Sequence, residues 1–187
     1  MSSTTPSLAQ ESKAQPQTAQ APLPLGWREV VPIHRLPVIT KTPVMIIAGA
    51  YLSHAEFHVN TVIATMVLAS ALWTVLYYYN ELTDIKLEKQ AEVQSGLDTL
   101  CLTLMALLVA MGFAVRIGVG VCLLGMAVSQ WVYCSPTLRL KRYWQANILL
   151  SGTINPILRF AAGAVWGTTE IPWLLLGMYV LLNFGAS

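Results

Sequence analysis

The chain alternates long apolar runs with short polar segments. The clearest run, from Thr61 to Tyr79, carries no charged side chain, and about twenty apolar residues in a helix cross the hydrocarbon core of a bilayer. Two similar runs extend from Thr99 to Val115 and from Ile117 to Tyr133. Because only Arg116 separates these two runs, the pattern predicts an antiparallel hairpin of two helices.

Three further runs complete the set: Pro37 to Ser53, Trp144 to Trp166 and Ile171 to Phe184. The first contains Lys41 and Pro43, and the last is short for a membrane span. The sequence therefore predicts an all-α integral membrane domain of about six transmembrane helices, occupying residues 26–187.

Composition supports a membrane protein. Charged residues make up 11% of the chain and hydrophobic residues 55%, whereas roughly 25% of residues are charged in soluble domains. Residues 1–25 are rich in Ser, Thr, Gln, Ala and Pro, which predicts a disordered polar tail. The net charge of +2 and the scattered basic residues exclude the continuous cationic face that nucleic-acid binding requires.

Lysine and arginine concentrate in alternate loops. The loops around His54, Arg116 and Glu170 contain one of these cations, Arg116. Because basic residues in short loops are retained on the cytoplasmic side, we expect the N-terminus and the two long polar loops to be cytoplasmic. The cations of that side are Arg28, Arg35, Lys41, Lys86, Lys89, Arg139, Lys141 and Arg142.

The first polar loop contains Asn80, Asp84 and Glu88, each four residues from the next. In a continued helix they share one face, and carboxylate oxygens beside phosphate are suitable ligands for Mg²⁺. The alternative is a solvated helix end whose acidic residues pair with Lys86 and Lys89. The spacing leaves both interpretations open.

The second polar loop places three cations, Arg139, Lys141 and Arg142, shortly after Pro136. The planar fork of arginine and the point charge of lysine together suit a diphosphate. Anchoring at the cytoplasmic surface explains the same residues without a ligand.

Together these features resemble the UbiA superfamily of intramembrane prenyltransferases. The family's first aspartate-rich motif, Asn-Asp-x-x-Asp-x-x-x-Asp, corresponds to Asn80, Glu81, Asp84 and Glu88, with glutamate at two aspartate positions. The resemblance covers residues 28–187.

Three other segments carry the resemblance. Gln94-Ser95-Gly96 sits where the family often has a stretch ending in Ser-Gly. The loop from Tyr133 to Arg142 resembles its Tyr-x-x-x-Lys region, and Leu158 to Gly163 looks like its Leu-Arg-x-x-Ala-Gly stretch.

The resemblance implies a nine-helix bundle around a central cavity, Mg²⁺ as cofactor, and transfer of a prenyl group from an allylic prenyl diphosphate to an acceptor such as an aromatic ring. It implies that Asn80, Asp84 and Glu88 are catalytic and hold the metal. The residues implied to bind substrate are Arg35, Tyr133, Arg139, Lys141, Arg142 and Arg159.

The chain departs from the family after the predicted sixth span. Glu170 is the one carboxylate side chain that follows Asp98, so the second aspartate-rich motif is missing. We therefore expect a C-terminally incomplete domain, completed by a separate C-terminal half or by an oligomer. Alternative functions are a terpene cyclase of the same superfamily and a non-catalytic membrane homologue.

Arg159 lies inside the fifth predicted span. A charged group there costs roughly 2.5–3.5 kcal/mol on insertion scales and normally faces the bundle interior. Contact with the prenyl diphosphate or the acceptor is the functional interpretation. Pairing with a polar residue such as Asn155 is the structural one.

Overall fold

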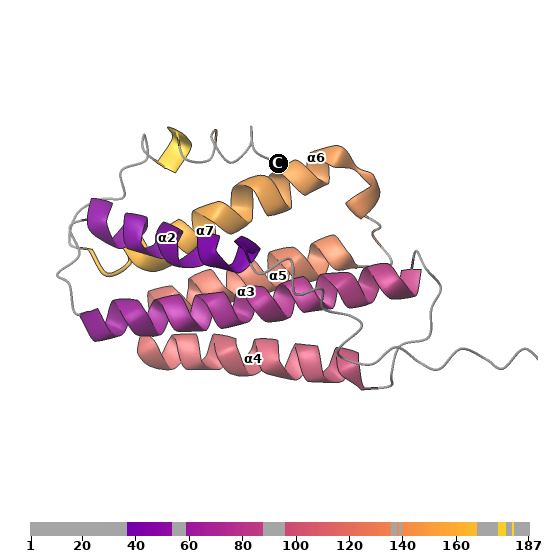
Figure 1. Ribbon diagram of the computed structural model, residues 1–187, viewed down its shortest axis with the longest axis horizontal. Coiled ribbons are helices and arrows are strands. Elements are labelled where there is room, and N and C mark those ends of the chain that lie inside the picture. The colour runs from indigo at the N-terminus through magenta and orange to yellow at the C-terminus, as the bar shows by residue number, and fades with distance from the viewer. Residues whose placement is uncertain are drawn as a thin grey trace, which may run out of the picture.

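The computed structural model describes residues 37–53, 59–87, 96–135, 138, 140–167, 176–178 and 181. The elements in this part of the chain are helices, which confirms the expected all-α fold (Figure 1). In chain order they are α2 (Pro37–Leu52), α3 (Val59–Leu87), α4 (Leu97–Val115), α5 (Ile117–Cys134), η2 (Leu140–Arg142), α6 (Trp144–Asn147), η3 (Ile148–Ile154) and α7 (Asn155–Ala164). The predicted polar tail lies outside the described residues.

Three helices, α3, α4 and α5, are long and apolar enough to cross a membrane. They contain the three clearest apolar runs of the sequence. The apolar part of α2 is shorter, from Lys41 to Leu52. The run from Trp144 to Trp166 is helical but divided into α6, η3 and α7, and most of the run from Ile171 to Phe184 lies outside the described residues. The structure thus supports three spans, and the count of six stays a prediction.

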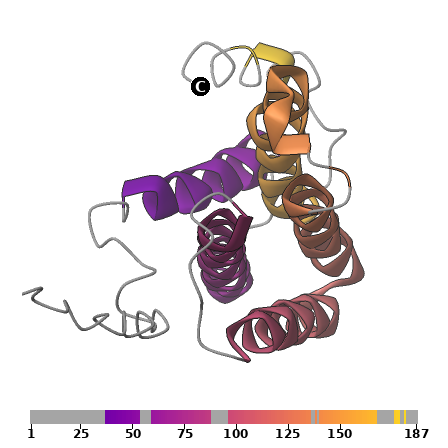
Figure 2. The same ribbon diagram turned by 90° about the vertical axis from the view of Figure 1, so that its right-hand side faces the viewer.

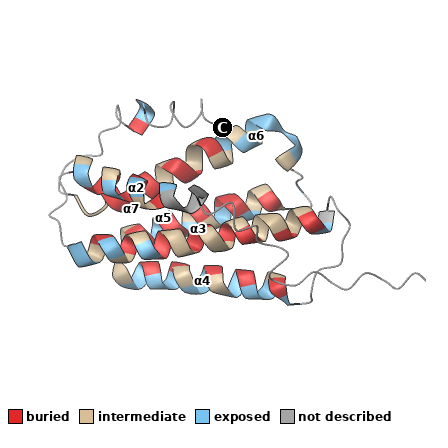
Figure 3. Ribbon diagram, viewed as in Figure 1, coloured by how far each residue is buried: buried red, intermediate tan, exposed pale blue. Residues whose placement is uncertain are grey.

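Helix α3 lies at the centre of the bundle. It contacts α2, α4, α5 and α7, and the view along the helices shows these four around it (Figure 2). Leu72, Leu76 and Leu82 of α3 are fully buried. Helix α4 instead exposes large apolar side chains such as Leu107 and Met111 on its outer face (Figure 3). Exposed apolar surface of this kind is typical of a protein that contacts lipid.

One extended residue, Arg116, connects α4 to α5, with φ −164° and ψ 139°. Its amide still donates to the carbonyl oxygen of Gly112 at 3.0 Å. Glycines allow the two helices to approach closely, because a Cβ atom at Gly112 would overlap Leu123 and one at Gly120 would overlap Phe113. The predicted antiparallel hairpin is confirmed.

Helices α2 and α7 cross at a reciprocal pair of glycines. A Cβ atom at Gly49 would overlap the backbone carbonyl oxygen of Phe160, and one at Gly163 would overlap the carbonyl oxygen of Ile46. Small residues at such crossings let helix backbones approach closely in membrane proteins. This contact packs α7 against the N-terminal part of the described bundle.

The helix from Trp144 to Ala164 widens at η3, a π-helical segment. The side-chain hydroxyl of Thr153 donates to the carbonyl oxygen of Ile148, and the side-chain amide of Asn155 donates to the carbonyl oxygen of Leu150. Both bonds are 3.1 Å long and reach five residues back. Because π segments are frequent at functional sites, the neighbourhood of η3 is a candidate site.

Polar contacts join the helix ends at both ends of the bundle. At one end, the indole nitrogen of Trp166 donates to Thr65 at 3.0 Å, and the guanidinium carbon of Arg116 lies 4.9 Å from the Trp166 ring centroid. At the other end, Lys86 forms an ion pair with Asp98 and joins α3 to α4. Lys141 of η2 contacts Asp84, near the C-terminal end of α3, at this second end, which confirms that the described parts of the acidic and basic motifs share one end.

Candidate functional site

Six of the nine predicted site residues belong to the described part of the chain. Asn80 and Asp84 lie on α3, Tyr133 on α5, Lys141 and Arg142 on η2, and Arg159 on α7. Arg35, Glu88 and Arg139 lie outside the described residues.

Helix α3 continues beyond the apolar run to Leu87, so Asn80 and Asp84 share one face as the spacing predicted. The side-chain amide of Asn80 donates to a carboxylate oxygen of Asp84 at 3.2 Å. Two of the three residues predicted to share this helix face, Asn80 and Asp84, are therefore directly linked.

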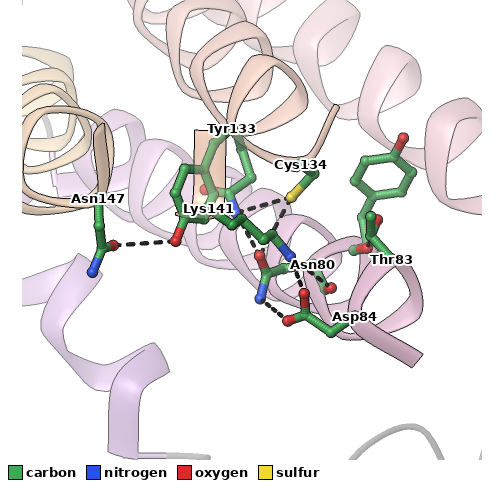
Figure 4. A network of polar contacts seen from close by, with 9 residues as sticks. Asn80, Thr83, Asp84, Tyr133, Cys134, Lys141 and Asn147 are labelled. Atoms are coloured by element: carbon green, nitrogen blue, oxygen red, sulfur yellow. Dashed lines mark hydrogen bonds and ion pairs between the residues drawn. The ribbon is translucent and has the colours of Figure 1, made fainter. Parts of the chain in front are cut away.

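Lys141 connects the basic loop to the face of α3 that carries Asn80 and Asp84 (Figure 4). Its ammonium group forms an ion pair with Asp84 and donates to the backbone carbonyl oxygen of Asn80 at 3.3 Å. It also lies 5.7 Å from the ring centroid of Tyr133. The structure thus brings Asn80, Asp84, Tyr133 and Lys141 into one network, although Lys141 is 57 positions from Asp84 in the chain.

Two residues of α5, which were not among the predicted site residues, complete the network. Gln130 and Cys134 both donate to the side-chain oxygen of Asn80, at 3.4 Å and 3.3 Å. These contacts orient the Asn80 amide with its oxygen toward α5 and its NH₂ group toward Asp84. A glutamine within an apolar span was the available signal, since polar residues inside membrane helices are often functional.

A cavity of about 240 Å³ opens beside the network, between α3, α5 and the π segment. Three ring side chains and several neutral polar groups line it. Among the described residues, tyrosine is the one ionisable type in this lining. Its lining residues are Trp73, Tyr77, Asn80, Gln130, Tyr133, Asn147 and Ser151. Tyr133 also donates to the side-chain oxygen of Asn147 at 3.3 Å, which holds α5 against α6.

Arg159 is buried in the bundle interior, with 5% of its surface exposed. Its guanidinium carbon lies 3.7 Å from the ring centroid of Trp73, and one of its terminal nitrogens lies 4.0 Å from the sulfur of Met45. The side chain of Asn155 is engaged with Ser129 at 3.3 Å and with the carbonyl oxygen of Leu150. Arg159 therefore adjoins the cavity through Trp73, whereas Arg142 is exposed on η2.

The described residues do not fit a magnesium ion in this arrangement. The Asp84 carboxylate is neutralised by Lys141, and the Asn80 side-chain oxygen accepts from Gln130 and Cys134. Within the described residues, no three His, Cys, Asp or Glu side chains lie close enough together to hold a metal. The third predicted ligand, Glu88, lies outside this part of the chain.

The network joins a carboxylate, an ammonium group and two amides at the mouth of a cavity lined by rings. It can hold an anionic head group through Lys141 and a neutral polar ring in the cavity. Comparison with family models, curated proteins and solved structures finds no match to this chain.

Proposed function

We propose that this chain is an integral membrane prenyltransferase, or a portion of one, that transfers a prenyl group from an allylic prenyl diphosphate to an acceptor. In this proposal the chain crosses the membrane six times, and its N-terminus and both motif loops are cytoplasmic. The observation that carries the proposal is the Lys141–Asp84 contact, because it unites the two predicted motifs beside a cavity.

The apolar bundle supplies the environment for the isoprenoid tail, since its helices present hydrocarbon side chains along their length. The diphosphate lies at the polar end, where Lys141 and the exposed Arg142 neutralise its oxygens. The cavity lined by Trp73 and Tyr77 receives the acceptor ring.

The reaction proceeds by breaking the bond between the allylic carbon and the diphosphate oxygen. The bonding electrons leave with the diphosphate, whose growing negative charge the cationic side chains stabilise. The acceptor ring then bonds to the allylic carbon and loses its proton to water. The proposal includes Mg²⁺ held by Asp84 and Glu88, which would add charge stabilisation of the leaving diphosphate. This part of the proposal requires Lys141 to leave Asp84.

A second candidate is a non-catalytic membrane subunit. The same ion pair favours it, because a carboxylate neutralised by a lysine is a stable structural link between α3 and η2. In that case the network holds the end of the bundle together and binds no diphosphate.

Purified chain in detergent with farnesyl diphosphate, Mg²⁺ and a phenolic acceptor tests the proposal. A prenyltransferase releases diphosphate and forms a prenylated acceptor. Release of diphosphate in the absence of an acceptor, with a cyclised hydrocarbon product, identifies a terpene cyclase. A chain that neither binds nor cleaves the substrate, alone or with a separately supplied C-terminal half, is the non-catalytic subunit.

A further inference from the structure

A lysine occupies the place where the acidic motif would hold a metal ion. The Lys141 ammonium group pairs with the Asp84 carboxylate, and the two side chains are 18% and 27% exposed. The same ammonium group donates to the backbone of Asn80 and lies near the Tyr133 ring. The cation is therefore held from α3, α5 and η2 together.

Asn80 is also fully engaged. Its NH₂ group donates to Asp84, and its side-chain oxygen accepts from Gln130 and Cys134. A metal ion at this position would have to reverse the amide or break these contacts. Asn80 and Asp84 are thus engaged by hydrogen-bond donors and one ammonium group.

A lysine and a divalent cation exclude each other at one carboxylate. They require the same oxygen lone pairs, and two like charges about 4 Å apart repel strongly in a partly buried site. The charge-assisted contact with the Lys141 ammonium group stabilises the Asp84 carboxylate. Any metal must overcome this stabilisation.

We propose that Lys141 is the resident cation of this site and competes with divalent metal for Asp84. Without an anionic ligand, Asp84 does not bind metal. The inference concerns the chain without any ligand and does not rest on the proposed function.

Manganese binding, followed by the electron paramagnetic resonance of free Mn²⁺, tests the competition without substrate or turnover. The proteins are the parent chain, Lys141→Met, Lys141→Arg and the double variant Asp84→Asn/Lys141→Met. We expect Lys141→Met to bind Mn²⁺ at least about tenfold more tightly than the parent, because the repulsion between the ammonium group and the metal ion is removed. Lys141→Arg retains the charge and should remain like the parent, and the double variant should lose the gain.

The chain offers a matched control in its second lysine–carboxylate pair. Lys86 and Asp98 form an ion pair at the same end of the bundle, on more exposed side chains. Lys86→Met removes the same charge and should leave Mn²⁺ affinity unchanged. An equal gain in Lys86→Met, or no gain in Lys141→Met, overturns the proposal.

A second comparison needs no lysine variant and serves if Lys141→Met does not fold. Because Asp84 is engaged in the parent chain, Asp84→Asn should bind Mn²⁺ no more weakly than the parent. Tight Mn²⁺ binding by the parent that disappears in Asp84→Asn overturns the proposal. These outcomes are independent of prenyl transfer, so failure of the inference and failure of the proposed enzyme activity are distinguishable.

Discussion

The guanidinium carbon of Arg159 on α7 lies 3.7 Å from the ring centroid of Trp73 on α3. Both residues are at least nine-tenths buried, and Trp73 lines the cavity beside the polar network. A desolvated cation–π contact contributes about 2 kcal/mol or more. The buried arginine thus fixes one wall of the candidate site.

We expect Arg159→Leu to weaken prenyl-diphosphate binding. Trp73 then loses the group that holds its ring, and Trp73 lines the same cavity as Asn80, which contacts the proposed diphosphate-binding Lys141. Arg159→Lys retains the charge but not the planar stacking, so its affinity should lie between those of the parent and Arg159→Leu. Equilibrium binding of a non-hydrolysable prenyl diphosphate checks this order. Equal affinity in Arg159→Leu and the parent, with reduced thermal stability, would make Arg159 a packing residue.

Asp84→Asn should abolish Mg²⁺-dependent prenyl-diphosphate binding while the fold persists. The substitution keeps the size of the side chain and its proximity to Asn80 but deletes the negative charge that pairs with Lys141. A solvated surface carboxylate would change stability by no more than about 0.5 kcal/mol and leave ligand binding alone. The assay compares binding with and without Mg²⁺ in both proteins. Equal Mg²⁺-dependent binding in both proteins would remove Asp84 from the site.

Gly49→Ala and Gly163→Ala should each destabilise the protein by about 1–3 kcal/mol. The added methyl group at either position would overlap a backbone carbonyl oxygen of the facing helix, and a backbone cannot move aside as a flexible side chain can. Gly177→Ala is the control, because a Cβ atom there meets no heavy atom of a described residue within 4 Å. Thermal unfolding in detergent measures the differences, and three equal melting temperatures would contradict the packing of α2 against α7.

Membrane orientation can be tested by labelling single cysteines in intact cells. Cysteines at positions 90 and 138 should be labelled from the cytoplasm, and cysteines at positions 56 and 116 from the opposite side. The native cysteines Cys101, Cys122 and Cys134 are buried, which keeps background labelling low. Labelling of positions 90 and 138 from opposite sides would contradict the shared end of the two motif loops. The reverse pattern at all four positions would contradict the orientation predicted from charge.

The positions of α3, α4 and α5, and the end of the bundle that the two motifs share, follow from the sequence alone. The length of an apolar run is a local property, and a helix of fixed rise per residue converts it directly into a candidate span. Because a single residue connects α4 to α5, the two helices can pack against each other only as an antiparallel hairpin. The four-residue spacing of Asn80 and Asp84 likewise placed them on one face once the helix continued through them.

The partners of the charged side chains were decided only by tertiary structure. Loop composition predicted that Lys141 and Asp84 occur at one end, but not that they contact each other, because this depends on how η2 packs against α3. The amide orientation of Asn80 depends on α5, and the stacking of Arg159 depends on the angle at which α7 meets α3. The periodicity of apolar residues indicates which side chains avoid contact with water. The choice among buried partners is made by the packing of whole helix faces, which brings together residues far apart in the chain.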